Sequence, residues 1–269
     1  MAVITMLSAK GSPGVTTAVA ALATMWPGPV LVADADPSGG DMVPGWLGSW
    51  WADGWIRADK GVVSFARSTR QLTSVPAEGF AGHVQVVPGA RHVRVLGGVA
   101  HRARGAAIGE TEWRRIASAA RDLTRDGGPD VLVDAGRWVP ETPWPLITAA
   151  DLVLLAVRPS LRHVHAAIPV VCALREMVRT DRLALAVFAT TPRQARAVSH
   201  TMGLPIAVEF PDEPTEARVF SDGTPHHHDP RHCPLQCSAY EAAHGLHTRL
   251  RLHASRTQPS VFPNRKGAA

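Results

Sequence analysis

The chain has 269 residues, of which 45% are hydrophobic and 19% charged, which is a globular balance and enough for one sizeable α/β domain. Its net charge of +5 favours polyanionic partners only weakly, because the arginines are spread along the chain. Three cysteines, Cys172, Cys233 and Cys237, lack disulfide-framework spacing and predict a reducing, cytoplasmic location. No apolar run approaches the roughly 20 residues of a membrane span, so we expect no stable membrane insertion.

The first predicted elements surround a glycine-rich segment. An apolar run at residues 2–7 predicts a strand, and an alanine-rich run at residues 18–25 predicts a helix. Between them, residues 9–17 read AKGSPGVTT. A strand, a glycine-rich turn and a helix in this order can bind phosphate, because backbone N–H groups and the positive end of the helix dipole meet there. The usual pattern is G-x-x-x-x-G-K-[ST], but Ala9 replaces its first glycine and Val15 its lysine, so a turn without a phosphate role is the alternative.

Two later apolar runs end in aspartate. Residues 30–33 predict a buried strand that leads into Asp34 and Asp36, and residues 130–133 predict another that leads into Asp134. Ligands of open parallel sheets bind at the carboxyl ends of the strands, and carboxylates are ligands that Mg²⁺ prefers. The alternative is that these aspartates only end their strands.

The remaining pattern predicts strands alternating with helices. Strands are expected at residues 84–89, where the strand ends in a turn, and at 150–159, 182–191 and 204–212; helices are expected at 61–67, 112–124 and 234–252, and a loop at 91–108. This alternation predicts a mostly parallel sheet covered by helices on both faces.

Two segments carry unusual composition. Residues 46–55 contain four tryptophans, which predict either a small local core or a partner-binding patch. The stretch His226–Cys237 offers zinc-ligand side chains without a second well-spaced ligand pair, so we expect a loop and a helix in which Cys237 is a core residue, with a metal site as the alternative. That helix is expected to pack on the sheet rather than bind a membrane.

The loop KGSPGVTT resembles the deviant phosphate loop of the ParA/MinD family of P-loop ATPases, which reads KGGxGKTT, and in particular actinobacterial-type members with a KGxPGVTT loop. The stretches VLVADADPSGGDM and DVLVDAGR resemble the family's acidic motifs, in the same order. The resemblance implies a three-layer P-loop NTPase fold over residues 1–252, and we expect residues 253–269 to form a disordered tail.

The resemblance also implies roles for individual residues. Lys10 would reach across a homodimer to the partner's nucleotide, and Asp36 would position the attacking water. Mg²⁺ would be held by Thr16, Asp34 and Asp134. Where many members have an adenine-reading asparagine, this chain has Ala189-Thr190-Thr191. The nucleotide-binding residues implied are Lys10, Gly11, Ser12, Pro13, Gly14, Val15, Thr16 and Thr17.

The implied function is a nucleotide-dependent switch that binds ATP and Mg²⁺ with slow or absent hydrolysis, in the partitioning, positioning or assembly of a cellular cargo. Val15 leaves open whether the protein is an ATPase, because the missing lysine removes a charge from the phosphate site. A non-catalytic interaction or scaffold module that keeps the fold is the alternative. A partition component that binds non-specific DNA is a third hypothesis, which a salt-dependent shift assay tests.

Overall fold

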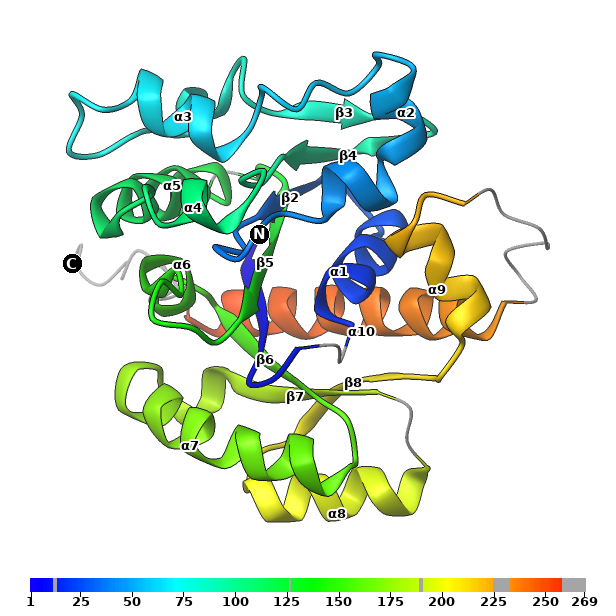
Figure 1. The fold of residues 1–269 in the computed structure, drawn as a ribbon. Coiled ribbons are helices and arrows are strands. Elements are labelled where there is room, and N and C mark those ends of the chain that lie inside the picture. The colour runs from blue at the N-terminus through cyan, green and yellow to red at the C-terminus, as the bar shows by residue number, and fades with distance from the viewer. Residues whose placement is uncertain (12–13, 126, 189–190, 225–232, 258–269) are drawn as a thin grey trace, which may run out of the picture.

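The structure is a computed structural model that describes residues 1–11, 14–125, 127–188, 191–224 and 233–257, the last five by their backbone alone. It has three layers, with helices on both faces of an eight-stranded sheet (Figure 1). The strand order is β3-β4-β2-β5-β1-β6-β7-β8, and every neighbouring pair is parallel except β3 and β4. The predicted α/β class with a mostly parallel, doubly covered sheet is therefore confirmed.

The strands follow the apolar runs of the sequence. Those of the sheet's interior are buried on both faces, as parallel strands between two helix layers must be. In β1, Val3 and Leu7 pack into one apolar layer while Ile4 and Met6 pack into the other. The strands are β1 (Val3–Ser8), β2 (Val30–Asp34), β3 (Gln85–Val87), β4 (Ala90–Leu96), β5 (Asp130–Arg137), β6 (Leu152–Val157), β7 (Leu183–Phe188) and β8 (Ile206–Phe210).

Each helix layer closes one of two hydrophobic clusters. One face carries α3 (Val62–Ser68), α5 (Glu110–Leu123), α6 (Trp144–Thr148), α7 (Leu161–Met177) and α8 (Pro192–Met202). The other face carries α1 (Val15–Thr24), η1 (Met42–Trp46), α9 (Pro214–Ser221) and α10 (Pro234–Thr257), as Figure 1 shows. Shorter helical turns are α2 (Gly48–Ala52), η2 (Ala77–Phe80), α4 (Arg102–Gly105) and η3 (Thr180–Arg182).

The prediction of a loop at residues 91–108 is wrong for the first part of that segment. Residues Ala90–Leu96 form β4, which pairs in parallel with β2 and antiparallel with β3. Val93 and Val95 are buried, whereas His92 and Arg94 point outward and are exposed. His92 and Arg94 thus lie on the outer face of the strand, opposite the buried Val93 and Val95, and they obscure its alternation of apolar and polar residues in the sequence.

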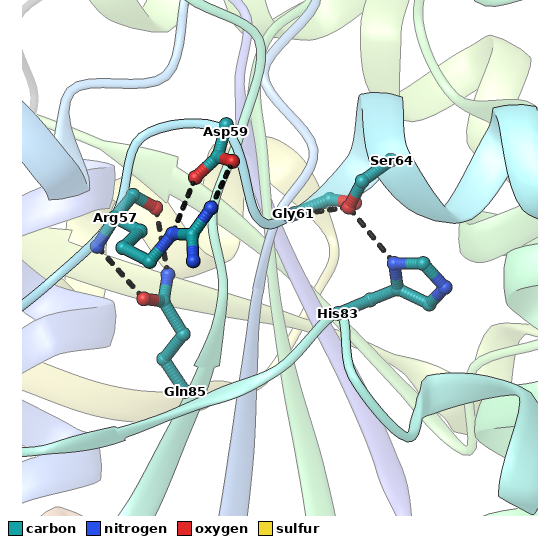
Figure 2. A network of polar contacts seen from close by, with 6 residues as sticks. All are labelled: Arg57, Asp59, Gly61, Ser64, His83 and Gln85. Atoms are coloured by element: carbon teal, nitrogen blue, oxygen red, sulfur yellow. Dashed lines mark hydrogen bonds and ion pairs between the residues drawn. The ribbon is translucent and has the colours of Figure 1, made fainter.

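Side-chain contacts connect β3 to the segment that precedes α3 (Figure 2). The Arg57 N–H donates to Gln85 Oε1 at 2.8 Å, and Gln85 Nε2 donates to the Arg57 carbonyl at 2.9 Å. His83 Nδ1 lies 2.9 Å from Ser64 Oγ, which also bonds the backbone of Gly61. These contacts hold the antiparallel edge of the sheet to the long connection between β2 and β3.

The tryptophan segment divides between core and surface. Trp46 is buried and Trp50 packs partly buried against the same cluster, whereas Trp51 and Trp55 are 46% and 73% exposed. The local-core interpretation therefore holds for Trp46 and Trp50 and fails for Trp51 and Trp55.

The C-terminal helix packs on the sheet, but the cysteine that it carries faces away from the core. Leu235, Ala239 and Ala243 are buried, whereas Cys237 falls on the outer face of α10 and is exposed, so its predicted core role is wrong. The helix continues to Thr257, past the expected start of the tail, because no proline interrupts it before Pro259. Residues 225–232 and 258–269 lie outside the described residues. They include most of the stretch His226–Cys237, for which a metal site was the alternative, and most of the expected tail. Within the described part, no helix is both long and apolar enough to cross a membrane.

Candidate functional site

The N-terminus of α1 has the features of an anion-binding site. Gly14, which precedes α1, has a φ of 106°, a left-handed conformation that glycine adopts without strain. No described side chain caps α1, so the N–H groups of its first turn, at Val15, Thr16 and Thr17, remain directed out of the helix end. They are the donors that a phosphate group accepts from at a helix N-terminus. Ser12 and Pro13 of the predicted loop lie outside the described residues.

A pair of buried carboxylates lies beside this loop. Asp34 and Asp134 are paired in register on β2 and β5 and are 1% and 0% exposed. Asp34 Oδ2 accepts from the Met42 N–H at 3.3 Å, and Asp134 Oδ1 accepts from the Gly136 N–H at 2.8 Å. The other oxygen of each, Asp34 Oδ1 and Asp134 Oδ2, is buried without a hydrogen-bond partner among the described residues. Two unsatisfied carboxylate oxygens are costly unless a cation or a proton compensates them.

Burial shifts the pKa of both groups toward the neutral form. It raises the pKa of Asp134 to about 7, against the lowering effects of the Thr16 hydroxyl and the Gly136 N–H. It also raises the pKa of Asp34 well above its usual value, and the nearby charge of Asp134 adds to that rise. A divalent cation at the two oxygens would remove this penalty, because an opposite charge favours the ionised form.

Close backbone contacts fix the acidic side chains in place. A Cβ on Gly98 would lie 2.6 Å from Asp34 Cγ, so the chain can pass the carboxylate only as glycine. A Cβ on Gly136 would lie 2.1 Å from Asp36 Cγ. The half-buried Asp36 accepts at Oδ1 from the Ser38 N–H at 2.8 Å. Burial raises its pKa, while the Ser38 contacts and the charge of Arg137 lower it.

The loop and the acidic edge share a cleft of about 650 Å³. One wall is the loop and the start of α1, with Gly11, Gly14 and Val15 to Thr17, and a second is formed by Asp36, Gly136 and Arg137. The third wall joins distant parts of the chain, because Gly45 of η1 packs so closely on α9 that a Cβ there would lie 2.4 Å from the Ser221 carbonyl oxygen. A cleft of this volume accommodates a small-molecule ligand.

A smaller hollow of about 160 Å³ adjoins the cleft at Gly14 and Thr17. Phe188 and Phe210, at the ends of β7 and β8, line it with rings stacked 5.2 Å apart. Ala189 and Thr190, at the position that the ParA/MinD resemblance assigns to an adenine-reading asparagine, lie outside the described residues. Thr191 is instead the N-cap of α8, where its hydroxyl accepts from the Gln194 N–H.

The structure brings together most of the predicted site residues. Gly11, Gly14, Val15, Thr16, Thr17 and Asp36 line the cleft, and Asp34 and Asp134 lie buried at the strand ends beside it. Lys10 is exposed and is not among the residues that line the cleft. Sequence reasoning gave no role to Arg137, Asp41 or Ser221, which also line it. For Arg137 a signal existed, because it directly follows the strand that carries Asp134.

Comparison with solved structures identifies the architecture. The MinD cell division protein of Aquifex aeolicus superposes with a TM-score of 0.70 at 19% identity, over 92% of this chain and 98% of that one. A ParA family ATPase from Chlorobium tepidum gives 0.66 at 16% identity, over 90% and 98%. Pyrococcus horikoshii MinD, complexed with Mg-ADP, gives 0.61 at 13% identity, over 93% and 98%. Neither the protein-family models nor the curated protein sequences contain a match. The chain therefore has the three-layer P-loop fold of the MinD and ParA ATPases.

Proposed function

We propose that this protein is a nucleotide-dependent switch that binds ATP and Mg²⁺ in the cleft between the loop and the acidic edge. The observation that carries the proposal is a conjunction: the N-terminus of α1 faces a cleft beside two buried carboxylate oxygens, which have no hydrogen-bond partner among the residues that the structure describes. The first feature suits the phosphates of a nucleotide and the second suits a divalent cation. The fold supports the same ligand, since one structural neighbour is a MinD complexed with Mg-ADP.

Each residue has a defined part in this proposal. The N–H groups of the first turn of α1 donate to phosphate oxygens, and the Thr16 hydroxyl, Asp34 and Asp134 hold Mg²⁺. When bound, Mg²⁺ neutralises charge on the phosphates. Asp36, at the wall of the cleft, orients a water molecule toward them.

Val15 sets the expected rate of turnover. Phosphoryl transfer is catalysed mainly by placed charge, and this apolar side chain lines the cleft where the usual loop carries a lysine. We therefore propose slow or absent hydrolysis, with the bound nucleotide controlling contacts to a second copy of the chain and to a cargo. The same residue favours the second candidate function, a scaffold module without nucleotide turnover.

Calorimetric titration with ATP, with and without Mg²⁺, tests the proposal. The expected result is micromolar binding that depends on Mg²⁺ and is lost in Thr16→Ala. Thr24→Ala is the matched control, because its hydroxyl bonds the Ala20 carbonyl at the far end of α1, and it should bind like the unmodified protein. Absence of heat at millimolar ATP, with a folded protein, would overturn nucleotide binding and leave the scaffold function. Phosphate release measured on the same samples reports turnover.

A further inference from the structure

Arg137 brings a guanidinium group to the phosphate loop from the neighbouring strand. It is the last residue of β5 and lies in register with Ser8, the last residue of β1. Its Nη1 lies 3.6 Å from the position that a Cβ on Gly11 would occupy, and the side chain lines the cleft. The cation therefore lies over the same turn whose helix end faces the cleft.

The backbone around Arg137 is held rigidly. Gly136 turns the chain with a φ of 63°, and its N–H donates to Asp134. The N–H of Trp138 donates to the Ser8 carbonyl at 2.7 Å. Arg137 is therefore fixed on both sides to the elements that carry the acidic pair and the loop, and a site residue on a strand end is placed more precisely than one on a free loop.

The guanidinium of Arg137 is available to a ligand. Among the described residues it forms no ion pair and donates no side-chain hydrogen bond, although its charge lowers the pKa of Asp36. Eight other arginines do pair with a carboxylate: Arg57, Arg102, Arg114, Arg115, Arg125, Arg158, Arg179 and Arg218. An arginine left unpaired at the wall of a cleft that contains an anion-binding helix end is placed for a phosphate.

We infer that Arg137 binds the phosphates of the nucleotide and replaces, from β5, the positive charge that Val15 removes from the loop. This inference rests on the proposed nucleotide-binding function. Guanidinium binds phosphate through two parallel N–H donors, so one arginine can supply both the charge and the donors of a missing lysine. The competing role is that Arg137 only offsets the charge of Asp36.

Calorimetry of ATP with Mg²⁺ tests the inference with Arg137→Gln against Arg179→Gln. The control removes the same charge from an exposed arginine that precedes the amino end of β7, whereas Arg137 lies at the carboxyl end of β5. We expect Arg137→Gln to weaken ATP binding by about tenfold or more, as for loss of a charge-assisted hydrogen bond, and Arg179→Gln to leave it unchanged. Equal affinities of the two variants would overturn the inference and leave the proposed function intact. Absence of binding by the unmodified protein would overturn both.

Val15→Lys separates a phosphate contact from an effect through Asp36. Returning the lysine should restore ATP affinity in the Val15→Lys/Arg137→Gln double variant. A folded double variant that still binds weakly would overturn the inference, because the lost charge would then act on Asp36. Should the double variant not fold, Arg137→Lys decides instead: it retains most of the affinity if charge at the phosphates matters, and a loss equal to that of Arg137→Gln contradicts the inference.

Discussion

Asp34 and Asp134 occupy paired positions on the neighbouring parallel strands β2 and β5, and each has one buried carboxylate oxygen without a hydrogen-bond partner in the described part of the chain. Burial raises the pKa of both groups. The free energy of unfolding is therefore lowered whenever the two carboxylates are ionised and no cation is present.

The first prediction concerns the stability of the protein without ligand. The pKa of Asp134 is about 7 when folded, above its ordinary value of 3.8, so the folded chain binds this proton more tightly than the unfolded chain does. The contribution of Asp134 to the free energy of unfolding is therefore greatest below about pH 4 and falls as pH rises to about 7. Asp134→Asn removes this loss, and its stability advantage should grow by roughly 2–3 kcal/mol between about pH 5 and about pH 8.

Urea denaturation at the two pH values, without nucleotide or Mg²⁺, measures this difference. Asp53→Asn, which changes an exposed carboxyl group, is the control and should follow the unmodified protein at both values. If Asp134→Asn runs parallel to the control, the buried pair carries no such penalty.

The second prediction concerns the close contact between Gly136 and Asp36. A methyl group at residue 136 would meet the Asp36 carboxyl group, and the φ of 63° adds strain. Gly136→Ala should therefore lower the free energy of unfolding by about 1 kcal/mol from strain and by about 1–3 kcal/mol more from crowding. Gly54→Ala is matched in backbone conformation, with a φ of 77°, but meets nothing within 4 Å. If chemical denaturation gives the same loss of unfolding free energy for Gly136→Ala and Gly54→Ala, the Asp36 carboxyl group can move aside without an energetic penalty.

The third prediction concerns Asp130, at the start of β5. Its Oδ1 accepts from the Ala2 N–H at 2.7 Å, and its Oδ2 accepts from Trp26 Nε1 at 2.9 Å, both in buried surroundings. Asp130→Asn removes one acceptor and should cost about 1–3 kcal/mol, because a buried donor loses its partner. Asp59→Asn, an exposed carboxylate paired with Arg57, should leave the denaturation midpoint unchanged. A midpoint of Asp130→Asn equal to that of Asp59→Asn contradicts the role given to the buried bonds.

The fourth prediction concerns Lys10 and a second copy of the chain. Lys10 is exposed and does not line the cleft of its own protomer. Under the proposed function, Lys10→Ala should keep ATP binding within about threefold at concentrations where the protein is monomeric, and should weaken ATP-dependent dimerisation by about tenfold or more. Sedimentation with and without ATP measures the second quantity. Lys60→Ala changes a half-buried lysine that does not line the cleft, and a dimer equally weakened by both variants would mean that net charge, not Lys10, is responsible.

The apolar strands and their terminal aspartates were predictable from the sequence for a physical reason. A strand buried on both faces must be a continuous apolar run, and a parallel sheet brings all carboxyl ends to one edge. Asp34 and Asp134 could therefore be placed together without a structure. The second strand of the sheet, β4, was less readable, since its outward residues His92 and Arg94 interrupt the apolar pattern that identifies the inner strands.

The direction in which a side chain points was harder to predict. The sequence places Arg137 next to a strand end, but its position over Gly11 depends on the turn at Gly136 and on the register between β1 and β5. Cys237 and the tryptophans of residues 46–55 show the same limit, because the burial of each depends on which side of its helix or turn packs against the rest of the fold.

The contact between Gly45 and Ser221 has a consequence for how the cleft forms as the chain leaves the ribosome. Every acidic and loop residue of the cleft precedes Trp138, yet the wall at η1 is completed by the end of α9. A nascent chain of which only β1 to β5 have left the ribosome contains the acidic and loop residues of the cleft but lacks its third wall. The cleft is therefore assembled late in synthesis, and no N-terminal fragment that stops before α9 contains it whole.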